Sequence, residues 1–506
     1  MIVFMRLHSL PNKNILDQLI SISNKNPNHI IFIEKEKRIT RKEFIEKILK
    51  VKGGLKKKGL KKGDKVLSLL GNSYEEIILF FACITSGIIW IPLGAERKGV
   101  GLKYIIKLTK PKIIFSTQSK PKNLPKNLYR KIFKINKNLK NLEWKENFFN
   151  ILDLDKLSCI IFTSGTTGPP KGVMVSQKML LTSAYATGMA ADINAKDKLL
   201  LWESLYHIGG LEIIVLALLE DITITIEKKF SATNFWTSVR KYKVSKLHYL
   251  GGILDILLKL KKNKYDKKHN IKLGFGAGAR PDVITKFKIR FNIDLREVYG
   301  MTEASSFTTI NFNQKKNSIG KALPWFDVKI KKKFNKDKVG EIIIKEKIKG
   351  LLTKGYYNDI KATKELLKKD GLHTGDIAKK DTRDNYFYVG RLKDSIRVKG
   401  ENISSWEIET TLNKKNFISE SAILKTKADI GENDMIAVVI PKANTLNIQQ
   451  IALKCQKDLS KKYFPRYWCL IQKFPRTPSQ RIDKKNINIS KIRIFDKQKN
   501  KFTSIK

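Results

Sequence analysis

Residues 163–173 read Thr163-Ser164-Gly165-Thr166-Thr167-Gly168-Pro169-Pro170-Lys171-Gly172-Val173. They follow Ser158-Cys159-Ile160-Ile161-Phe162, a short apolar run that predicts a buried strand. Successive hydroxyl residues and glycines bring small donors and bare backbone N–H groups together, and Lys171 adds a positive charge. Two prolines separate Gly168 from Lys171, so this is not the P-loop in which Gly-Lys-Ser/Thr opens a helix. The stretch therefore predicts a polyphosphate-binding loop of another kind, with an ordinary turn between two strands as the alternative.

Further motifs follow this loop in a fixed order along the chain: Leu205-Tyr206-His207, Gly276-Ala277-Gly278, Tyr299-Gly300-Met301-Thr302-Glu303, His373-Thr374-Gly375-Asp376, Gly390-Arg391-Leu392-Lys393-Asp394 and Lys399-Gly400-Glu401-Asn402-Ile403-Ser404. With these motifs the sequence resembles the adenylate-forming superfamily. That superfamily includes acyl-CoA synthetases, the adenylation domains of peptide synthetases and firefly luciferases. One such motif alone is weak evidence, whereas six in order are strong. The resemblance implies ATP, CoA and Mg²⁺ as cofactors.

The length and composition are those of a globular protein. The chain has 506 residues, and 42% of them are hydrophobic, which is enough to fill several cores. No apolar run reaches the roughly 18 residues that cross a bilayer, and the opening residues 1–7 are too short for a signal peptide. We therefore expect a cytoplasmic protein with no membrane span. The four cysteines lie far apart without paired spacing, which favours neither a disulfide framework nor a zinc site.

The chain is strongly basic, with 100 Lys and Arg against 47 Asp and Glu and a formal charge of +53. The lysines are spread over the whole chain, and no helix-turn-helix, zinc-finger or RNA-recognition signature accompanies them. This pattern predicts a diffusely solvated lysine surface and no specific nucleic-acid partner. Such a surface attracts polyanions in general, which assists the capture of ATP and CoA.

The order of predicted elements indicates an α/β fold. A capping box at Thr40-Arg41-Lys42-Glu43 opens a helix, and a strand at 66–70, a helix at 75–86 and a strand at 88–92 follow. Such alternation is typical of parallel α/β subdomains. Residues 119–149, rich in lysine, asparagine and proline, predict a surface excursion, and Ser176 is expected to cap a helix. From Gly340 onward, short alternating strands predict a small β-rich subdomain.

The resemblance also implies a division into two domains. The N-terminal AMP-binding domain is expected to comprise residues 1–392, and a small, mobile α+β lid domain to comprise residues 393–506, with the hinge at Lys393. In the lid, a hairpin around Lys399 and a helix from about Ser405 are predicted.

Nucleotide-binding roles follow from the resemblance. Gly276, Ala277 and Gly278 would form the floor of the adenine and acyl sites, and Tyr299, next to Gly300, would stack on adenine. Asp376 would accept both ribose hydroxyls, because a carboxylate offers two acceptor oxygens, and Arg391 would add a fixed set of donors. Without the companion motifs, the alternative is that Asp376 caps a turn and that Arg391 lies at the end of a strand.

The catalytic roles carried over are those of His207, Thr302, Glu303, Lys399 and Arg481. His207 would lie where the carboxylate substrate meets the thiol tunnel, with Gly209 and Gly210 leaving room for an acyl group. Thr302 would contact the α-phosphate, and Glu303 would bind Mg²⁺, which prefers oxygen ligands. A lone histidine is more often structural, and a lone glutamate is in most proteins a surface carboxylate, so each role depends on the neighbouring motifs.

The chain departs from the family pattern near its end. It reads Pro475-Arg476-Thr477-Pro478-Ser479-Gln480-Arg481-Ile482-Asp483-Lys484, where the family has Pro-x-Thr-x-x-Gly-Lys. Arg481 thus replaces the lysine that bridges the carboxylate and the α-phosphate during adenylation. Arginine keeps the charge, but its donors are planar and fixed, so the exchange is not neutral by default.

Taken together, the sequence predicts an ATP-dependent acyl-CoA ligase, most similar to the carnitine and crotonobetaine type. Its substrates would be a small-molecule carboxylic acid and coenzyme A. An adenylation enzyme that loads a carrier protein is the first alternative. A nucleotide-binding pseudoenzyme is the second, because of Arg481. The sequence does not specify the acid or the oligomeric state.

Overall fold

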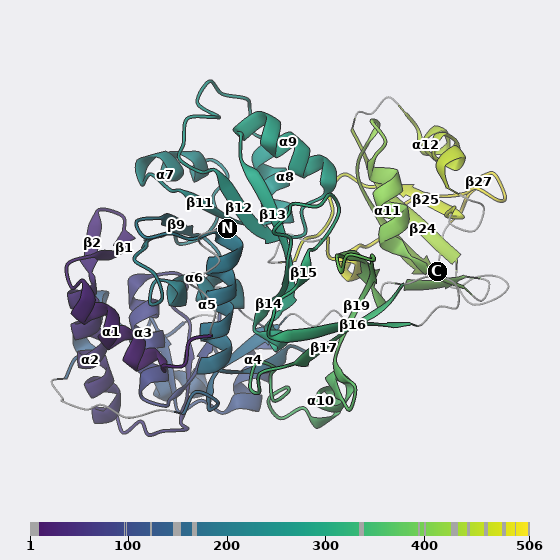
Figure 1. The fold of residues 1–506 in the computed structure, drawn as a ribbon. Coiled ribbons are helices and arrows are strands. Elements are labelled where there is room, and N and C mark those ends of the chain that lie inside the picture. Colours follow the sequence, from purple (N-terminus) through teal and green to yellow (C-terminus); the bar gives the residue numbers. More distant parts are fainter. Residues whose placement is uncertain are drawn as a thin grey trace. The chain divides into compact units, whose positions relative to one another are not determined.

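The computed structural model describes residues 10–95, 97, 99–121, 124–144, 153–163, 169–332, 339–392, 395–398, 401–426, 434–442, 446–459, 464–477, 482–490 and 492–503 (Figure 1). The chain forms two compact units. The first unit comprises residues 1–327 and 344–372, and the second comprises residues 328–343 and 373–506. Each is described by itself below. The predicted hinge Lys393 lies outside the described residues, so a domain boundary between 392 and 393 stays a prediction.

One six-stranded sheet of the first unit has the order β6-β5-β3-β4-β7-β8. All its neighbours pair in parallel except β7 and β8, which are antiparallel. The strands are β3 (Lys65–Ser68), β4 (Ile89–Pro92), β5 (Ile113–Ser116), β6 (Ile132–Lys134), β7 (Leu157–Thr163) and β8 (Lys171–Ser176). The helices along this part of the chain are α1 (Ile15–Lys25), α2 (Arg41–Lys57), α3 (Tyr74–Thr85), α4 (Gly99–Thr109) and α5 (Gln177–Ala191). The predicted parallel α/β alternation is confirmed.

The second sheet of this unit has nine strands in the order β15-β14-β13-β12-β11-β9-β10-β1-β2. Its six central strands, β13-β12-β11-β9-β10-β1, are parallel to one another. The strands are β1 (Ile30–Glu34), β2 (Lys37–Thr40), β9 (Lys198–Leu201), β10 (Thr223–Ile226), β11 (Lys246–Leu250), β12 (Leu273–Ala277), β13 (Asp294–Met301), β14 (Ser306–Ile310) and β15 (Lys321–Ala322). The helices that follow them are α6 (Ile208–Leu216), α7 (Phe235–Lys241), α8 (Gly251–Lys259) and α9 (Pro281–Phe291). Aromatic side chains of α7 and α9 pack with β11 in one apolar core.

Local capping explains where two helices begin. The Thr40 hydroxyl accepts the Glu43 N–H, and the Glu43 carboxylate accepts the Thr40 N–H, so the predicted capping box opens α2. The Ser176 hydroxyl accepts the Met179 N–H and caps α5, also as predicted. The expectation of a mere surface excursion at 119–149 is wrong in part, because β6 within it extends the sheet in parallel beside β5.

The strands after residue 325 form small β-rich sheets. One has the order β16-β17-β19-β18, with β20 also paired to β19, and another has the order β23-β24-β25-β26-β27. The strands are β16 (Phe326–Lys332), β17 (Val339–Glu346), β18 (Leu367–Lys368), β19 (Gly371–Lys380), β20 (Tyr386–Arg391), β21 (Ser395–Val398), β22 (Glu401–Ser404), β23 (Ile418–Thr426), β24 (Asp434–Pro441), β25 (Tyr467–Leu470), β26 (Ile494–Asp496) and β27 (Lys501–Thr503). The helices are α10 (Ile360–Leu366), α11 (Ser405–Asn413) and α12 (Ile448–Cys455). Trp468 is fully buried in the core of the last sheet.

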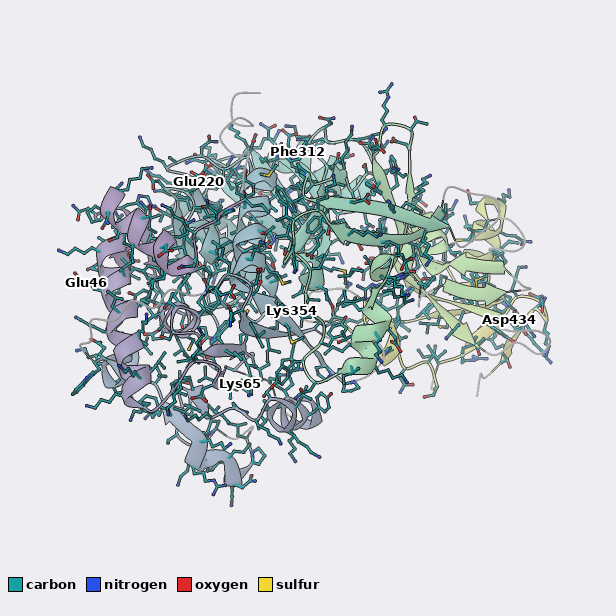
Figure 2. The ribbon with its side chains drawn as sticks, turned by 60° about the horizontal axis from the view of Figure 1, so that its bottom comes forward. Glu46, Lys65, Glu220, Phe312, Lys354 and Asp434 are labelled. Carbon is teal, nitrogen blue, oxygen red and sulfur yellow. The ribbon has the colours of Figure 1, made fainter. Side chains whose placement is uncertain are left out.

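The surface agrees with the scattered positive charge of the sequence. Figure 2 shows side chains tipped with nitrogen projecting along the whole outline of the ribbon. Among the described helices, none combines the length and the apolar character that a bilayer crossing requires.

Candidate active site

The predicted phosphate loop is held at both ends by paired strands. β7 delivers the chain into the loop and β8 receives it, with Thr163 directly opposite Lys171 in the antiparallel register. The Thr163 hydroxyl also donates to the Lys171 carbonyl oxygen at 3.4 Å. Ser164, Gly165, Thr166, Thr167 and Gly168 lie outside the described residues, so their phosphate contacts stay predictions. The strand pair fixes Lys171 at the mouth of this loop.

The segment 353–357 runs along the free side of β8. The Tyr357 N–H donates to the Gly172 carbonyl at 2.7 Å, and the Met174 N–H donates to the Gly355 carbonyl at 3.1 Å. At Gly355 the backbone φ is +119°, which favours glycine, and a side chain there would overlap with Thr363. This backbone pairing places the neighbouring Tyr356 beside Lys171.

Tyr356 connects two residues that the sequence singled out separately. Its hydroxyl donates to Glu303 Oε1 at 2.8 Å, and Lys171 Nζ lies 4.9 Å from the centroid of its ring. The Thr353 N–H donates to the Glu303 carbonyl at 2.8 Å, which ties the same segment to the turn that follows β13. Lys171, Tyr356 and Glu303, from three separate segments, therefore form one cluster. The sequence motifs predict no role for Tyr356.

The motif at 299–303 covers the end of β13 and the start of the tight turn between β13 and β14. Tyr299, Thr302 and Glu303 are all buried. A side chain at Gly300 would overlap with the backbone of Ser306, whose own φ is positive at 65°. The close approach of the two antiparallel strands therefore requires glycine here. It keeps Tyr299, Thr302 and Glu303 within five residues of one another, at the point where Glu303 joins the cluster with Lys171 and Tyr356.

The two glycines of the turn after β12 are required for different structural reasons. A side chain at Gly276 would overlap with the backbone of Tyr249 on the neighbouring strand β11. Gly278 adopts φ +83°, and a side chain there would meet no atom of the chain. Gly276 thus serves strand packing, whereas the open space at Gly278 is compatible with the predicted adenine and acyl floor, which includes Ala277.

Glu297 is a site residue that sequence reasoning missed. Its carboxylate accepts the N–H groups of Gly278 and Ala279, both at 3.0 Å, and the Tyr249 hydroxyl at 2.6 Å. Burial raises the pKa of Glu297 to about 7, although these three hydrogen bonds lower it. The sequence feature that could have indicated it is an acidic residue within a buried strand, two positions before Tyr299.

His207 precedes the first residue of α6. Burial, and to a smaller extent the charge of Arg97, lowers the pKa of His207 to about 4, so its ring is neutral at physiological pH. Its Nε2 atom is shielded from solvent and has no hydrogen-bond partner among the described residues. Such an atom is suited to contact a substrate group.

The expectation that Gly209 and Gly210 leave room for an acyl group is wrong. A side chain at Gly209 would overlap with the Glu203 carboxylate, and one at Gly210 with the Ser204 backbone. The sharp turn before α6 folds residues 203 and 204 back onto the first turn of the helix. Asn72, also missed, holds this turn: its amide donates to the Glu203 carbonyl at 2.8 Å and accepts the Leu205 N–H at 2.9 Å.

The second unit brings Asp376 and Arg391 together. They lie opposite each other on β19 and β20, and Arg391 Nε donates to Asp376 Oδ1 at 3.2 Å. Before Asp376, the Gly375 N–H donates to Glu341 Oε1 at 3.0 Å, and His373 Nδ1 lies 3.0 Å from Glu341 Oε2. The predicted ribose pair is thus a local structure of one unit, held by a buried Glu-His pair.

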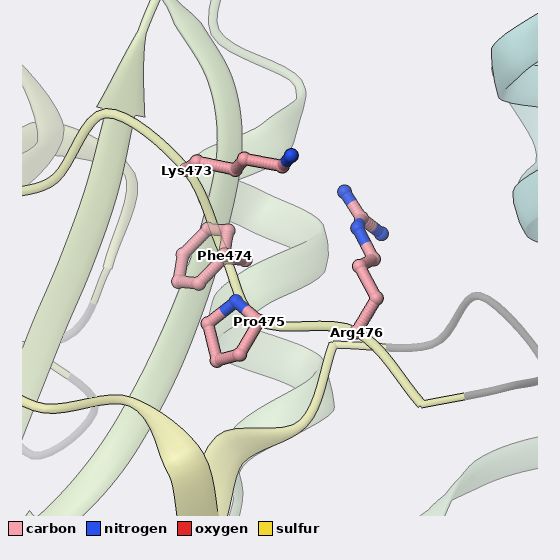
Figure 3. A pocket seen from close by; sticks show the side chains of 4 residues that line it. All are labelled: Lys473, Phe474, Pro475 and Arg476. Atoms are coloured by element: carbon pink, nitrogen blue, oxygen red, sulfur yellow. The ribbon is translucent and has the colours of Figure 1, made fainter. Parts of the chain in front are cut away.

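The C-terminal predictions Lys399 and Arg481 lie outside the described residues. The segment before Arg481 borders a surface hollow of about 570 Å³ lined by Lys473, Phe474, Pro475 and Arg476. Figure 3 shows the charged ends of Lys473 and Arg476 extending toward the same side of this segment. The Arg476 side chain forms an ion pair with Glu420 at 2.5 Å. The Arg476 backbone forms an isolated antiparallel β-bridge with Ile482. The two ends of the segment that carries Arg481 are therefore joined.

The residues present fit a magnesium ion bound together with phosphates. Among the described residues, no group of three or more His, Cys, Asp or Glu side chains could hold a metal alone. Mg²⁺ typically uses one or two protein carboxylates beside phosphate oxygens and water. The buried Glu303 carboxylate, oriented by the Tyr356 hydroxyl, meets that requirement.

The fold has solved counterparts. The ATP-bound MatB from Rhodopseudomonas palustris superposes with a TM-score of 0.85 at 23% identity, over 93% of this chain and 98% of that chain. This is the architecture of adenylate-forming ligases, with parallel-sheet subdomains and a separate small β-rich sheet.

The sequence comparisons define the family. The AMP-binding enzyme family matches residues 21–357, and the chain therefore belongs to it. Among curated relatives, the 2-succinylbenzoate–CoA ligase of Bacillus cereus is 26% identical over 463 residues, 89% of this chain and 93% of its own length. The long-chain-fatty-acid–CoA ligase FadD13 of Mycobacterium tuberculosis is 25% identical over 447 residues, 84% and 87% of the two chains. The enzyme class is that of AMP-forming acyl-CoA ligases, whose usual cofactors are ATP, CoA and Mg²⁺.

Proposed function

We propose that this protein activates a carboxylic acid with ATP, releasing pyrophosphate, and then transfers the acyl group to coenzyme A, releasing AMP. The observation that supports this most is the cluster of Lys171, Tyr356 and Glu303 at the mouth of the predicted phosphate loop. It combines a cation for phosphates with a carboxylate suited to Mg²⁺. These are the groups that pyrophosphate departure requires.

In the first step, an oxygen of the acid attacks the α-phosphorus of ATP in line with the departing pyrophosphate. We assign Thr302 to the α-phosphate and Tyr299 to the adenine ring. Lys171 and the loop residues 163–168 neutralise the leaving group. Mg²⁺, held by Glu303 and the phosphates, would supply charge neutralisation. Asp376 and Arg391 are assigned to the ribose, and Arg481 to the bridge between carboxylate and phosphate.

In the second step, the thiolate sulfur of CoA attacks the acyl carbonyl carbon and the bond to AMP breaks. The lid domain 393–506 would rotate about Lys393 so that Lys399 replaces Arg481 at the active site. The neutral His207 would lie beside the acyl group, because its unpartnered Nε2 can accept or donate one hydrogen bond there.

The proposal extends to the substrate class. The relatives include enzymes named for 2-succinylbenzoate and for long-chain fatty acids, whereas the motifs around 356–358 and 400–404 resemble ligases for small or medium acids of the carnitine and crotonobetaine type. We favour a small or medium acid, a cytoplasmic location and a role in fatty acid metabolism. Loading of a carrier protein is the enzymatic alternative. A nucleotide-binding pseudoenzyme is favoured only by Arg481.

A pyrophosphate-release screen over a panel of carboxylic acids, run with and without CoA, tests the proposal. We expect at least one acid to release pyrophosphate, and CoA to increase turnover with stoichiometric AMP and thioester. Release that needs an acyl carrier protein in place of CoA would favour the carrier-loading alternative. ATP binding without release for every acid would favour the pseudoenzyme.

A further inference from the structure

Glu297 is a buried carboxyl group that has no paired cation among the described residues. It lies on β13, is 8% exposed, and forms no ion pair with any described residue. The adjacent Arg296 does not neutralise it, because its guanidinium donates to the Ala190 carbonyl oxygen at 2.9 Å and to that of Met189 at 3.3 Å. A buried charge without a counter-ion is costly, so its hydrogen bonds must account for its position.

Both oxygens of Glu297 are used, and every partner is a donor. Oε2 accepts the Gly278 N–H, and Oε1 accepts the Ala279 N–H and the Tyr249 hydroxyl. An ionised carboxylate only accepts, which matches three donors, whereas an amide would turn its NH₂ group toward one of them. Bonds to an ionised acceptor are roughly twice as strong as neutral ones. The Gly276–Ala279 turn is therefore fixed best when Glu297 is ionised.

We propose that Glu297 is a positioning residue for the nucleotide, which as a carboxylate fixes the Gly276–Ala279 turn and on protonation loosens it, so that ATP binding weakens in acid. The inference rests on the proposed function, because the turn is a nucleotide surface only if the chain binds ATP. It assigns Glu297 no contact with the nucleotide itself.

The environment sets the pH range of this effect. Among the described residues, the groups that act on the Glu297 carboxyl are the Tyr249 hydroxyl from β11 and the two N–H groups of the turn. Burial raises the pKa of Tyr249 well above its usual range, so Tyr249 stays protonated. The Tyr249 hydroxyl also lies 3.2 Å from the Arg296 carbonyl oxygen. A proton on Glu297 can therefore point to Tyr249, which then donates to Arg296, and both N–H bonds lose their charge assistance. Because burial raises the Glu297 pKa to about 7, this change occurs near neutral pH.

The test measures the Kd of ATP by calorimetry across this pH range for the full-length protein. In the wild type, affinity should fall as the pH drops through about 7. Glu297→Gln should bind ATP about tenfold more weakly at alkaline pH, because it loses one hydrogen bond to a charged group. It should also lack the fall in ATP affinity toward low pH, which we call the acid limb. Tyr249→Phe should shift that limb to higher pH, because it removes a hydrogen bond that favours the carboxylate.

Glu76→Gln is the matched control. Glu76 is also a fully buried carboxyl whose pKa burial raises to about 8, and its hydrogen-bond partner is Ser68, away from the glycine turn. This variant should keep the wild-type acid limb. Thermal unfolding checks each variant, and Tyr249→Phe carries the test if Glu297→Gln does not fold. Infrared difference spectra between the wild type and Glu297→Gln, recorded without nucleotide, should show one protonated-carboxyl band that titrates near pH 7.

The outcomes separate this inference from the proposed function. An acid limb retained in Glu297→Gln, or alkaline ATP affinity equal to the wild type, would overturn the role of Glu297 while leaving ATP binding intact. Failure of the wild type to bind ATP at any pH would contradict the proposed function, and this inference with it.

Discussion

The Tyr356 hydroxyl donates a 2.8 Å hydrogen bond to the Glu303 carboxylate. The two residues are far apart in the sequence, and the Thr353 N–H bond to the Glu303 carbonyl holds their segments together. Lys171 lies over the ring of the same tyrosine. Tyr356 is therefore placed to orient the proposed magnesium ligand and to position the phosphate-loop lysine.

Removing the Tyr356 hydroxyl tests this arrangement. Tyr356→Phe should slow acid-dependent pyrophosphate release by roughly ten- to hundredfold, because a hydrogen bond to a charged group contributes about 1.5–3 kcal/mol. The Mg²⁺ concentration for half-maximal rate should rise as well. Tyr357→Phe is the control, since the neighbouring Tyr357 packs in an apolar cluster. Equal rates and equal Mg²⁺ dependence in both variants would contradict the orienting role.

The phosphate loop gives a second prediction. Lys171→Ala and Thr166→Ala should each lower the rate of adenylate formation, by about tenfold or more, because a positive charge or a hydroxyl donor at a leaving group acts mainly in the transition state. Folding should be unchanged, since neither substitution removes an apolar side chain from a core. Lys316→Ala, at an exposed lysine elsewhere in the same unit, serves as the control for loss of positive charge. Wild-type rates in both loop variants would refute the assignment.

Local sequence signals predicted the elements well. The capping box at Thr40 and the cap at Ser176 involve residues three positions apart, so a single sequence contains all the information needed. The short strand β6 was missed because its three residues are too few for a recognisable pattern. Its place in the sheet depends on pairing with β5, which is a tertiary contact.

The candidate site was predicted only where residue type and motif coincide. Glu297 looks like any strand glutamate until the Gly276–Ala279 turn is placed against it. Gly209 suggested space for a ligand, yet the structure fills that space with Glu203. A glycine in a sequence indicates that a side chain would not fit at that position. Only the folded structure shows which atoms occupy the space.

The buried Glu76 makes a prediction about stability and pH. Burial raises its pKa from 4.5 to about 8, against the lowering effect of the Ser68 hydroxyl. The folded protein then keeps a proton that the unfolded chain releases, so stability is lost as the pH rises from about 4.5 through 8. Glu76→Gln should become more stable than the wild type over this range, by roughly 1–3 kcal/mol at the alkaline end. Urea unfolding at several pH values measures it, and a difference that does not change with pH would refute it.

The two basic residues proposed for the lid should separate the half-reactions. Arg481→Ala should slow adenylate formation while thioester formation from supplied acyl adenylate and CoA survives, and Lys399→Ala should show the reverse. Each residue would reach the active site in only one lid orientation. Arg481→Lys restores the residue of the family pattern and shows whether arginine impairs the site. Faster adenylation indicates a site impaired by arginine, and slower adenylation indicates a site adapted to arginine. Equal damage to the same half-reaction by both alanine variants would rule out a two-state lid.

The central claim is that this enzyme works through an acyl adenylate. The most direct measurement supplies an active acid whose carboxylate carries heavy oxygen, together with ATP and CoA, and determines by mass spectrometry where the label goes. The account predicts one heavy oxygen in AMP, because the carboxylate oxygen that attacks the α-phosphorus stays there when the thiol displaces AMP. Unlabelled AMP, or label in free phosphate accompanied by ADP, would contradict it.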